Sequence, residues 1–369
     1  MMGIERRARA VVAVGGSLLL AAVPAIASAA VAVPPVASPA VVAAPSIVRA
    51  APALHVSGDR IVDSLGTAVQ LNGVNRSGTE YACAQGWGIF DGPNDAPSVA
   101  AIATWHVHVV RVPLNEDCWL GINGVDPSHA GQNYRSAIKA YVRVLERAGM
   151  NVILDLHWSA PGTQLALGQQ KMPDADHAPK FWRSVAGWFG ADTAVLLDLY
   201  NEPHDVSWRC WRDGCTVDGW KAAGMQKLVT TVRDAGARNI LMLGGLGWSG
   251  DLTRWKAHMP ADPLADLVAS WHVYDFGGCT TQACWQSNLD GVGGAAPVLL
   301  GEFGEADCAH GFVDGLMGWA DGESLGYVAW TWDTWTNCDG PTLITDYAGT
   351  PTGYGTGVRD HFVARFPPV

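Results

Sequence analysis

The chain has 369 residues, of which 49% are hydrophobic and only 16% are charged, so a large buried core is expected and disorder is not. Its formal net charge of −11 argues against nucleic acid or an anionic membrane surface as the main partner. The 17 Trp exceed what a core of this size requires, and Trp packs well against flat, partly apolar faces such as a sugar ring.

The N-terminus is typical of an export signal. Three arginines within the first nine residues precede an apolar run that ends in small residues suited to cleavage. A membrane anchor is the alternative, but the run is short and is interrupted by glycine and proline. We therefore predict a signal peptide over residues 1–29, a leader rich in Ala, Pro and Val over 30–53, and an extracellular catalytic domain over 54–369 without membrane contact.

Residues 54–63 open this domain with the sequence LHVSGDRIVD, which predicts a β-hairpin turning at Gly58-Asp59. Eight short runs rich in Val, Ile and Leu follow. Their apolarity is continuous rather than alternating, which is typical of parallel strands covered by helices. The runs span 69–75, 108–112, 151–157, 195–201, 239–245, 267–274, 297–303 and 326–332.

Helical patterns separate these runs, most clearly from Tyr134 to Ala148 and from Trp220 to Ala235, and glycine follows each. Eight strand–helix units predict a (β/α)8 TIM barrel of the α/β class, with the hairpin closing its floor. An open doubly wound sheet is the competitor. It normally carries a Gly-rich phosphate turn after its first strand, and GVNRSG at 73–78 is not such a turn.

Polar or aromatic side chains lie at the ends of six of the eight predicted strands. In TIM barrels the active site lies at this C-terminal edge of the strands, so these side chains should converge on one mouth. They are Arg111, His157, Asn201, Glu202, His272, Tyr274, Glu302 and Trp330.

All eight cysteines fall in loops on the same side of the predicted barrel, and an exported chain favours disulfides. Pairing sequence neighbours would use every cysteine, although the sequence leaves the connectivity open. A zinc site of the CxxC type is excluded because no spacing of two occurs. We expect disulfides to brace the loops that shape a cleft. The neighbouring pairs are Cys83 with Cys118, Cys210 with Cys215, Cys279 with Cys284 and Cys308 with Cys338.

Glu202 and Glu302 end the fourth and seventh predicted strands, which face each other across a barrel of eight. Cleaving a glycosidic bond needs one protonated acid for the leaving oxygen and one ionised carboxylate against the anomeric carbon. We expect Arg111 with His272 and Tyr274 to hold Glu302 ionised, while an apolar setting keeps Glu202 protonated. The alternative for a single glutamate at a strand end is a salt bridge near a helix cap.

The strand-end motifs VVRVPLNEDCW, VILDLHW, LLDLYNEPH, SWHVYDF, LLGEFGE and YVAWTW resemble, in order, those of glycoside hydrolase family 5, the cellulase-like retaining enzymes. The resemblance covers residues 54 to about 365. It implies that Glu202 is the general acid/base and Glu302 the nucleophile. It also implies supporting roles for Arg111 and Tyr274 beside the nucleophile, Asn201 at the sugar 2-hydroxyl, His157 and His272 in the central subsite, and Trp330 as its stacking platform.

The sequence leaves the roles of several side chains near the mouth open. Trp332 is a second candidate for the stacking platform. The loop 79–93, with Glu80, Trp87 and Phe90, and the segment 207–215, with Trp208 and Trp211, could add sugar subsites, block one end of the cleft, or simply pack together. Asn115, Glu116 and Asp117 could touch a sugar or cap a loop.

Three other patterns carry little weight. His106 and His108 have the HxH spacing of metal-dependent barrel hydrolases, but they enter their strand at the face opposite the mouth. Asn75-Arg76-Ser77 matches a glycosylation sequon, a triplet that is common by chance. Asp155 and Asp198 lie inside apolar strands, where we expect satisfied barrel carboxylates rather than catalysts.

The sequence thus predicts a monomeric, secreted retaining glycoside hydrolase that acts on a β-linked polysaccharide or oligosaccharide, with no metal or cofactor. We expect an endo-β-1,4-glucanase. A β-mannanase, an exo-β-glucosidase or a glycolipid glycosidase would use the same mechanism. A carbohydrate-binding protein without turnover is the alternative from another class, but it has no need of two opposed carboxylates with Arg111 and Tyr274.

Overall fold

The computed structural model describes residues 50–335 and 340–369 of the chain. The predicted signal peptide and almost all of the predicted leader lie outside the described residues. Among the residues that are described, no helix combines the length and apolarity needed to cross a membrane.

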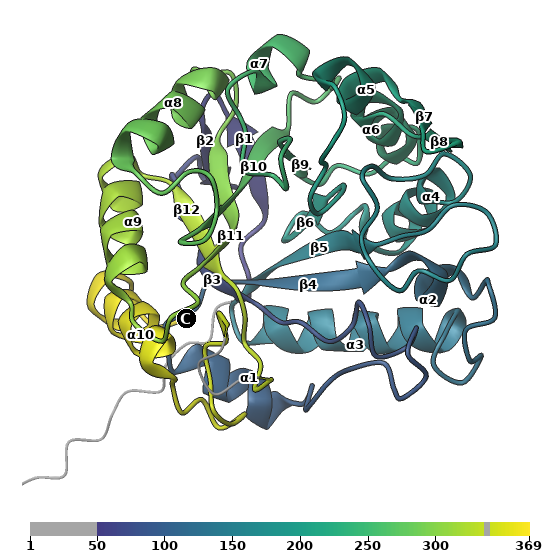
Figure 1. Cartoon of the computed structure of the whole chain (residues 1–369). Coiled ribbons are helices and arrows are strands. Elements are labelled where there is room, and N and C mark those ends of the chain that lie inside the picture. The colour runs from purple at the N-terminus through teal and green to yellow at the C-terminus, as the bar shows by residue number, and fades with distance from the viewer. Residues whose placement is uncertain (1–49, 336–339) are drawn as a thin grey trace, which may run out of the picture. The chain divides into compact units, whose positions relative to one another are not determined.

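Eight parallel strands close into a barrel, in the order β10-β11-β12-β3-β4-β5-β6-β9 around the ring (Figure 1). Helices surround the ring on its outside, so the strands are buried on both faces. Their sequences are mostly apolar, with a few buried polar residues such as Asn72, Arg111 and Asp155. This confirms the predicted TIM barrel. Its strands are β3 (Asn72–Asn75), β4 (Val109–Asn115), β5 (Asn151–Trp158), β6 (Val195–Asp198), β9 (Leu241–Gly244), β10 (Leu267–Tyr274), β11 (Val298–Gly304) and β12 (Gly326–Ala329).

The helices that separate the strands bury one apolar face each. In α3, for example, Tyr134, Ile138, Tyr141 and Leu145 recur every three or four residues and are all buried, as the sequence predicted. The helices are α1 (Ala96–Ala103), α2 (Glu116–Leu120), α3 (Gln132–Arg147), α4 (Ala178–Phe189), α5 (Trp208–Asp213), α6 (Met225–Asp234), α7 (Trp255–His258), α8 (Gln282–Val292), α9 (Gly311–Gly322) and α10 (Gly353–Arg365).

The predicted hairpin is present as β1 (Leu54–Ser57) and β2 (Arg60–Asp63), joined by a turn with Gly58 at φ +65°. Leu54 and Ile61 belong to the same buried cluster as Val109 and Ile153, near the starts of β4 and β5. The hairpin therefore packs under the N-terminal ends of the strands and closes the barrel floor, as expected.

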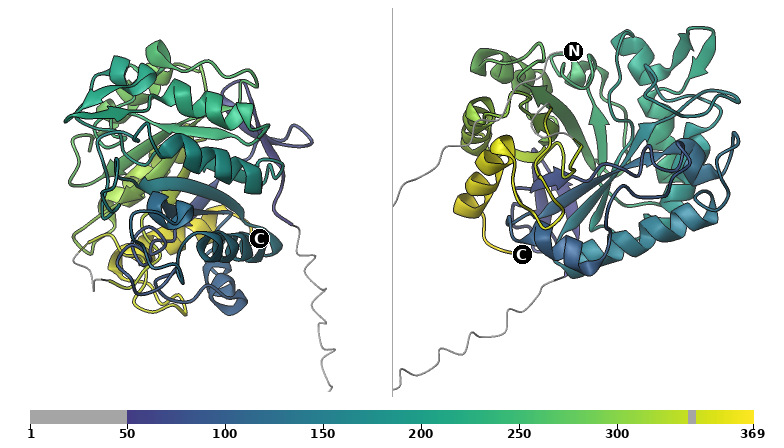
Figure 2. Two further views of the ribbon diagram at one scale, coloured as in Figure 1. Left: turned by 90° about the vertical axis from the view of Figure 1, so that its right-hand side faces the viewer. Right: turned by 60° about the horizontal axis from the view of Figure 1, so that its bottom comes forward.

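The end of the chain completes the outer layer. Figure 2 shows the C-terminal end of the chain close to the blue-coloured early segments of the barrel. Beyond α10, the carbonyl oxygen of Phe366 lies 2.7 Å from Nδ1 of His106, just before β4. His106 thus lies at the end of the barrel away from the mouth, as the sequence indicated.

A second hairpin, β7 (Cys215–Val217) with β8 (Trp220–Ala222), corrects the prediction of a helix from Trp220 to Ala235. The helix α6 begins only at Met225. Both residues of the turn, Asp218 and Gly219, have positive φ, the backbone that a two-residue hairpin requires. The Asp-Gly pair was the signal that the helical spacing of apolar residues obscured.

Three of the four neighbouring cysteine pairs are disulfides: Cys83–Cys118, Cys210–Cys215 and Cys279–Cys284. Cys308 is also disulfide-bonded. Its expected partner Cys338 lies outside the described residues.

Candidate active site

A cavity of about 830 Å³ opens at the C-terminal ends of the barrel strands. The structure brings seven of the eight predicted site residues to its wall. The eighth, Arg111, is fully buried beneath it. The seven are His157, Asn201, Glu202, His272, Tyr274, Glu302 and Trp330.

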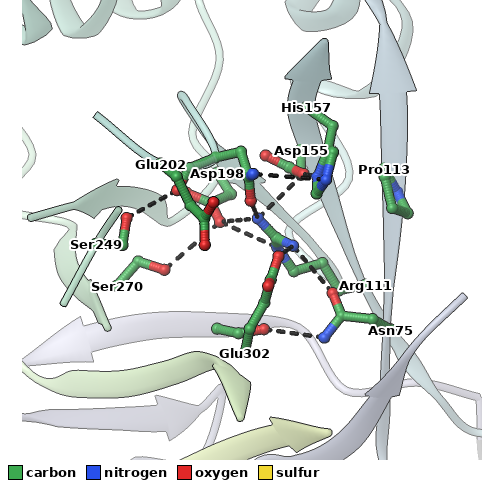
Figure 3. A network of polar contacts seen from close by, with 12 residues as sticks. Asn75, Arg111, Pro113, Asp155, His157, Asp198, Glu202, Ser249, Ser270 and Glu302 are labelled. Atoms are coloured by element: carbon green, nitrogen blue, oxygen red, sulfur yellow. Dashed lines mark hydrogen bonds and ion pairs between the residues drawn. The ribbon is translucent and has the colours of Figure 1, made fainter. Parts of the chain in front are cut away.

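Glu202 and Glu302 approach each other in this cavity from different parts of the ring (Figure 3). Glu202 lies four residues beyond the end of β6, whereas Glu302 lies within β11. His272 is between them: its Nδ1 lies 2.9 Å from Glu202 Oε1 and 3.5 Å from Glu302 Oε2. An oxygen of each carboxyl group and this nitrogen all lie within 4.8 Å of one another. Two carboxyl groups can therefore act on one bond.

Glu302 is 4% exposed and receives two strong donors. Arg111 Nη1 donates to its Oε1 at 2.7 Å, and the Tyr274 hydroxyl donates to its Oε2 at 2.6 Å. A guanidinium and a phenol O–H on the two oxygens are complementary to an ionised carboxylate.

Glu202 meets a different environment. Burial raises the pKa of its carboxyl group to about 7. Its neighbour His272 is buried as well, which lowers the pKa of that imidazole to about 3, so the ring is neutral and supplies no positive charge. Glu202 can therefore hold a proton near neutral pH. Its backbone carbonyl accepts a hydrogen bond from Gln169 Nε2 at 2.7 Å, which fixes the residue in place.

Arg111, in β4, connects the residues beneath the cavity. Besides Glu302, its guanidinium donates to Asn75 Oδ1 and to Asn201 Oδ1, each at 2.9 Å. It also lies 3.0 Å from one oxygen of Asp155 and 3.0 Å from one oxygen of Asp198. Its position is thus fixed from all sides, as the network in Figure 3 shows.

The charges around Arg111 favour its protonated form. Burial acts to lower the pKa of Arg111, but the carboxylates of Asp155, Asp198 and Glu302 outweigh it and raise the pKa above the ordinary value. Burial raises the pKa of Asp155 and of Asp198 to about 7, with Arg111 opposing the shift. Each aspartate contacts Arg111 through Oδ2, while its Oδ1 has no hydrogen-bond partner within the described residues. The expected satisfied carboxylates are therefore only half satisfied.

The remaining predicted residues form the wall of the cavity. The His157 ring stacks on Trp330, with centroids 5.3 Å apart and planes at 11°, and its Nδ1 lies 2.6 Å from Asp155 Oδ2. Asn201 Nδ2 donates to Gln169 Oε1 at 2.7 Å. Because Arg111 holds the amide oxygen of Asn201, the amide nitrogen faces the cavity.

The model of the family described as cellulase, glycosyl hydrolase family 5, matches residues 62–335 of this chain. The chain belongs to glycoside hydrolase family 5. It is therefore a glycoside hydrolase, and the resemblance of the strand-end motifs is confirmed.

Curated relatives of this family 5 enzyme include two kinds of endo-acting hydrolase. A mannan endo-1,4-beta-mannosidase of Streptomyces lividans is 26% identical over 303 residues, which cover 79% of this chain and 69% of the relative. Endoglucanase MaCel5A of Microbulbifer sp. (strain ALW1) is 25% identical over 196 residues, covering 53% and 33% respectively.

Solved structures share the fold. Cellulase Cel5C_n superposes with a TM-score of 0.65 at 19% identity, covering 87% of this chain and 94% of its own. The catalytic domain of a mannanase from Streptomyces sp. SirexAA-E gives a TM-score of 0.64 at 22% identity, covering 89% and 97%. Both likenesses support the barrel architecture of this family 5 chain.

Two residues that hold this site were missed by the sequence analysis. Asn75 ends β3, the first barrel strand, and its position at a strand end was the available signal. It is fully buried and donates to the Gly301 carbonyl at 3.1 Å, so the sequon match does not describe an exposed acceptor. Gln169 lies in the long loop after β5, where no sequence pattern pointed to it.

Trp332 is not a stacking platform. Strand β12 ends at Ala329, so the alternation of side chains along a strand does not extend to residue 332. Trp332 is 1% exposed and packs edge-on against Trp105 instead, at 4.8 Å between centroids.

In the loop 79–93 and the segment 207–215, some aromatic side chains are buried and others are exposed. Trp208 and Trp211 are buried and contact each other with centroids 5.2 Å apart, so they pack the loop rather than form subsites. Trp87 is 52% exposed beside the ring of Tyr81. Asn115 is fully buried and caps α2 by accepting the Cys118 N–H at 3.1 Å.

Two further aromatic side chains that the sequence did not single out line the cavity. Trp248, after β9, and Phe276, after β10, are 52% and 65% exposed. Trp248 also stacks on His204, at 4.6 Å and 9°. Exposed rings beside a catalytic cavity suit contact with a sugar.

Proposed function

We propose that this family 5 enzyme is an endo-β-1,4-glycanase that cleaves its substrate by double displacement. The observation that carries the proposal is the separation of the carboxyl groups of Glu202 and Glu302, whose nearest oxygens lie within 4.8 Å of each other. In retaining glycosidases the catalytic carboxyl groups are about 5–5.5 Å apart, whereas inverting enzymes keep about 6.5–9.5 Å to admit a water.

In the first step Glu302 attacks the anomeric carbon, and the bond to the leaving oxygen breaks. Glu202 gives its proton to that oxygen, which departs as the hydroxyl of the leaving sugar. In the second step Glu202, now ionised, takes a proton from water as the water attacks the glycosyl-enzyme ester, and Glu302 leaves as a carboxylate. The raised pKa of Glu202 and the donors on Glu302 support these roles.

The neighbours of the pair support the same reaction. Arg111 and Tyr274 hold the nucleophile in place through its two oxygens. The amide nitrogen of Asn201 can donate to the 2-hydroxyl of the sugar, a hydrogen bond that strengthens in the transition state. Trp330, braced by His157, offers its ring to the sugar at the cleavage point.

Aromatic side chains on two sides of the catalytic pair support internal cleavage. Tyr81 and Trp335 contact each other near Trp330, in the loops after β3 and β12. Trp248 and Phe276 lie in the loops after β9 and β10, two to four strands away around the ring. A polysaccharide could therefore extend past the cleaved bond in both directions.

The substrate that we propose is a β-1,4-linked glucan, as the sequence indicates. A β-1,4-mannan is the second candidate, because a mannan endo-1,4-beta-mannosidase aligns with 79% of this chain, the same share as an endoglucanase of Paenibacillus polymyxa. We also propose that residues 1–29 direct export of a monomeric enzyme. N-terminal sequencing of the mature protein from the culture medium would reveal a start near residue 30.

The test is to incubate the mature protein with soluble cellulose, β-mannan, xylan and mixed-linkage glucan and to size the products. A ladder of oligosaccharides from the glucan or the mannan is expected. Glu202→Gln and Glu302→Gln should each lower hydrolysis by a factor of roughly a thousand or more, because each removes a covalent or proton-transfer step. Glu323→Gln, at an exposed position after α9, is the matched control and should change nothing. Near-full activity in either catalytic variant would overturn the proposal.

A further inference from the structure

A second cluster of ionisable side chains lies where α2 meets the loop between β5 and α4. It consists of Glu116, Asp174 and His177, each of which places one potential ligand atom within 4.8 Å of the others. His177 Nδ1 lies 3.6 Å from Asp174 Oδ1 and 3.9 Å from Glu116 Oε2. This cluster is not part of the catalytic cavity, and its residues have no role in the mechanism above.

Glu116 is the unexplained member of the cluster. Its side chain is 0% exposed, and neither carboxyl oxygen forms a well-aligned hydrogen bond among the described residues, although the Asp174 carboxyl group and the Ala160 backbone N–H lie close to it. Asp174 is fully buried too; its Oδ1 accepts the His177 backbone N–H at 2.7 Å, but its Oδ2 is likewise unpartnered. An ionised carboxylate buried without a partner is costly, so native proteins pair such groups or use them to hold metals.

Lysine and arginine do not supply the missing charge. Within the described part of the chain, the salt bridges of Glu116 and Asp174 involve only His177. His177 Nδ1 thus lies near Glu116 Oε2 and Asp174 Oδ1, while Glu116 Oε1 and Asp174 Oδ2 are further buried oxygens without a hydrogen bond in the described part of the chain. The carboxyl group of Asp176 is another acidic neighbour of Asp174. The carbonyl oxygen of Ala160, 3.4 Å from His177 Nδ1, is a further oxygen at the same point.

We propose that Glu116, Asp174 and His177 bind a divalent cation of the Mn²⁺ or Zn²⁺ type. A mixed set of two carboxylates and one imidazole suits these ions, whereas Ca²⁺ and Mg²⁺ favour oxygen ligands alone. The Ala160 carbonyl or water would complete the coordination. The sequence alone predicts no metal, and for Glu116 it predicts a sugar contact or a loop cap.

The proposed ion would stabilise the loop that reaches the catalytic residues. Residues 159–177 form the connection between β5 and α4, and Gln169 within it holds both the amide of Asn201 and the backbone carbonyl of Glu202. Asp174 also bridges to Ala222 in β8. A cation at this point would therefore link α2, the loop and the second hairpin.

The alternative is that Glu116 and Asp174 share one proton and bind no ion. To separate the two, the mature protein is stripped with EDTA, dialysed, and titrated calorimetrically with Mn²⁺, Zn²⁺ or Ca²⁺, followed by metal analysis. We expect one equivalent of Mn²⁺ or Zn²⁺ and a rise in Tm of about 5 °C at a hundredfold excess over Kd. No uptake by the wild-type protein would overturn the proposal.

Three variants locate the ion. Glu116→Gln should abolish uptake with little change in shape, since it removes one charge. Glu146→Gln is the matched control, because Glu146 also places a buried, unpartnered oxygen near an aspartate, Asp192, but is not part of a cluster that includes histidine. Glu302→Gln tests the catalytic trio of Glu202, His272 and Glu302 as the binding place. The proposal fails if Glu116→Gln still binds one equivalent or if Glu302→Gln loses it.

A spectroscopic readout covers the case in which Glu116→Gln does not fold. Pulsed electron paramagnetic resonance of the wild-type protein with one equivalent of Mn²⁺ should show coupling to one imidazole nitrogen. That coupling should disappear in His177→Gln and persist in His272→Gln. Absence of nitrogen coupling, or its persistence in His177→Gln, would overturn the assignment.

Discussion

At the scale of single residues, the two glutamates of the active site differ in what their carboxyl groups touch. Glu302 contacts a guanidinium and a phenol O–H, whereas Glu202 contacts a neutral imidazole in a buried position. These different neighbours suit the roles that we propose, nucleophilic attack for Glu302 and proton transfer for Glu202. Arg111 and Tyr274 could be predicted from their strand ends. The roles of Gln169 and Asn75 could not, because they depend on contacts between distant segments.

The raised pKa of Glu202 predicts a cost in stability that depends on pH. A carboxyl group with a pKa of about 7 in the folded state and an ordinary pKa of 4.5 in the unfolded chain binds its proton more tightly when folded. The tighter proton binding stabilises the folded state fully below pH 4.5, and this stabilisation is lost as the pH rises to about 7. The free energy of unfolding therefore falls by roughly 3 kcal/mol at most over this range because of Glu202. Glu202→Gln should raise the free energy of unfolding in urea at about pH 8 by up to this amount and leave it almost unchanged at about pH 4. An equal change at both values would contradict the shift.

Removing the hydroxyl of Tyr274 should lower kcat without disturbing the fold. Tyr274→Phe removes the 2.6 Å hydrogen bond to Glu302 Oε2, and a hydrogen bond to a charged group contributes about 1.5–3 kcal/mol. We expect kcat to fall by roughly 10- to 100-fold with little change in Tm. Tyr141→Phe, a buried position in α3, is the control and should retain full activity. A Tyr274→Phe enzyme with unchanged kcat would remove this residue from the mechanism.

At the scale of elements, the barrel strands were predictable because their sequences are mostly apolar and six of the eight carry polar or aromatic residues at their ends. Register and loop structure were not predictable to the same degree. The β7–β8 hairpin replaces part of a predicted helix, since a disulfide and a two-residue turn hold residues 215–222 extended. Trp332 was misplaced for a related reason: the sequence does not mark where β12 stops.

The disulfides of the mouth loops predict different effects for long and short loops. Cys83–Cys118 closes a loop of 35 residues and Cys279–Cys284 closes one of five. By restricting the unfolded chain, the two disulfides should stabilise the folded state by about 4 and about 2 kcal/mol respectively. Replacing both cysteines of the first pair by Ser should therefore lower the free energy of unfolding more. The second pair borders the catalytic cavity, so its replacement should raise KM although it costs less stability. Urea unfolding and steady-state kinetics measure both; a larger stability loss from the short loop would contradict the argument.

Reducing the disulfides of the wild-type enzyme stepwise tests all of these loops in one experiment. The disulfides join loops at the mouth, whereas the barrel strands are held by their own hydrogen-bonded pairing, so activity should fall before the circular dichroism signal does. Simultaneous loss of both signals would count against a role for the disulfides in shaping the cleft.

At the scale of the whole molecule, the barrel orders the exposed aromatic side chains around one cavity. Trp335 follows β12 and Trp248 follows β9, three strands away around the ring, although the two residues are 87 positions apart in the sequence. Composition indicated an excess of Trp but not its division into buried and exposed rings. That division depends on the packing of loops.

Trp248 and Trp335 should have opposite effects on the pattern of cleavage products. Trp248 stacks on His204, which lies beside the Glu202 backbone, so it should contact the leaving part of the substrate. With oligosaccharides labelled at the reducing end, Trp248→Ala should shorten the labelled products, and Trp335→Ala should lengthen them, each with roughly a tenfold rise in KM. Identical product patterns in both variants would argue against subsites on two sides.

The most direct measurement for the central claim is to trap the glycosyl-enzyme. The enzyme is incubated with a 2-deoxy-2-fluoro glycoside that carries a good leaving group, digested, and its peptides are sequenced by mass spectrometry. If Glu302 is the nucleophile, one sugar should be attached to the peptide that contains it, specifically on that side chain. A sugar on another residue, or rapid turnover to the inverted anomer without any labelled peptide, would contradict the account.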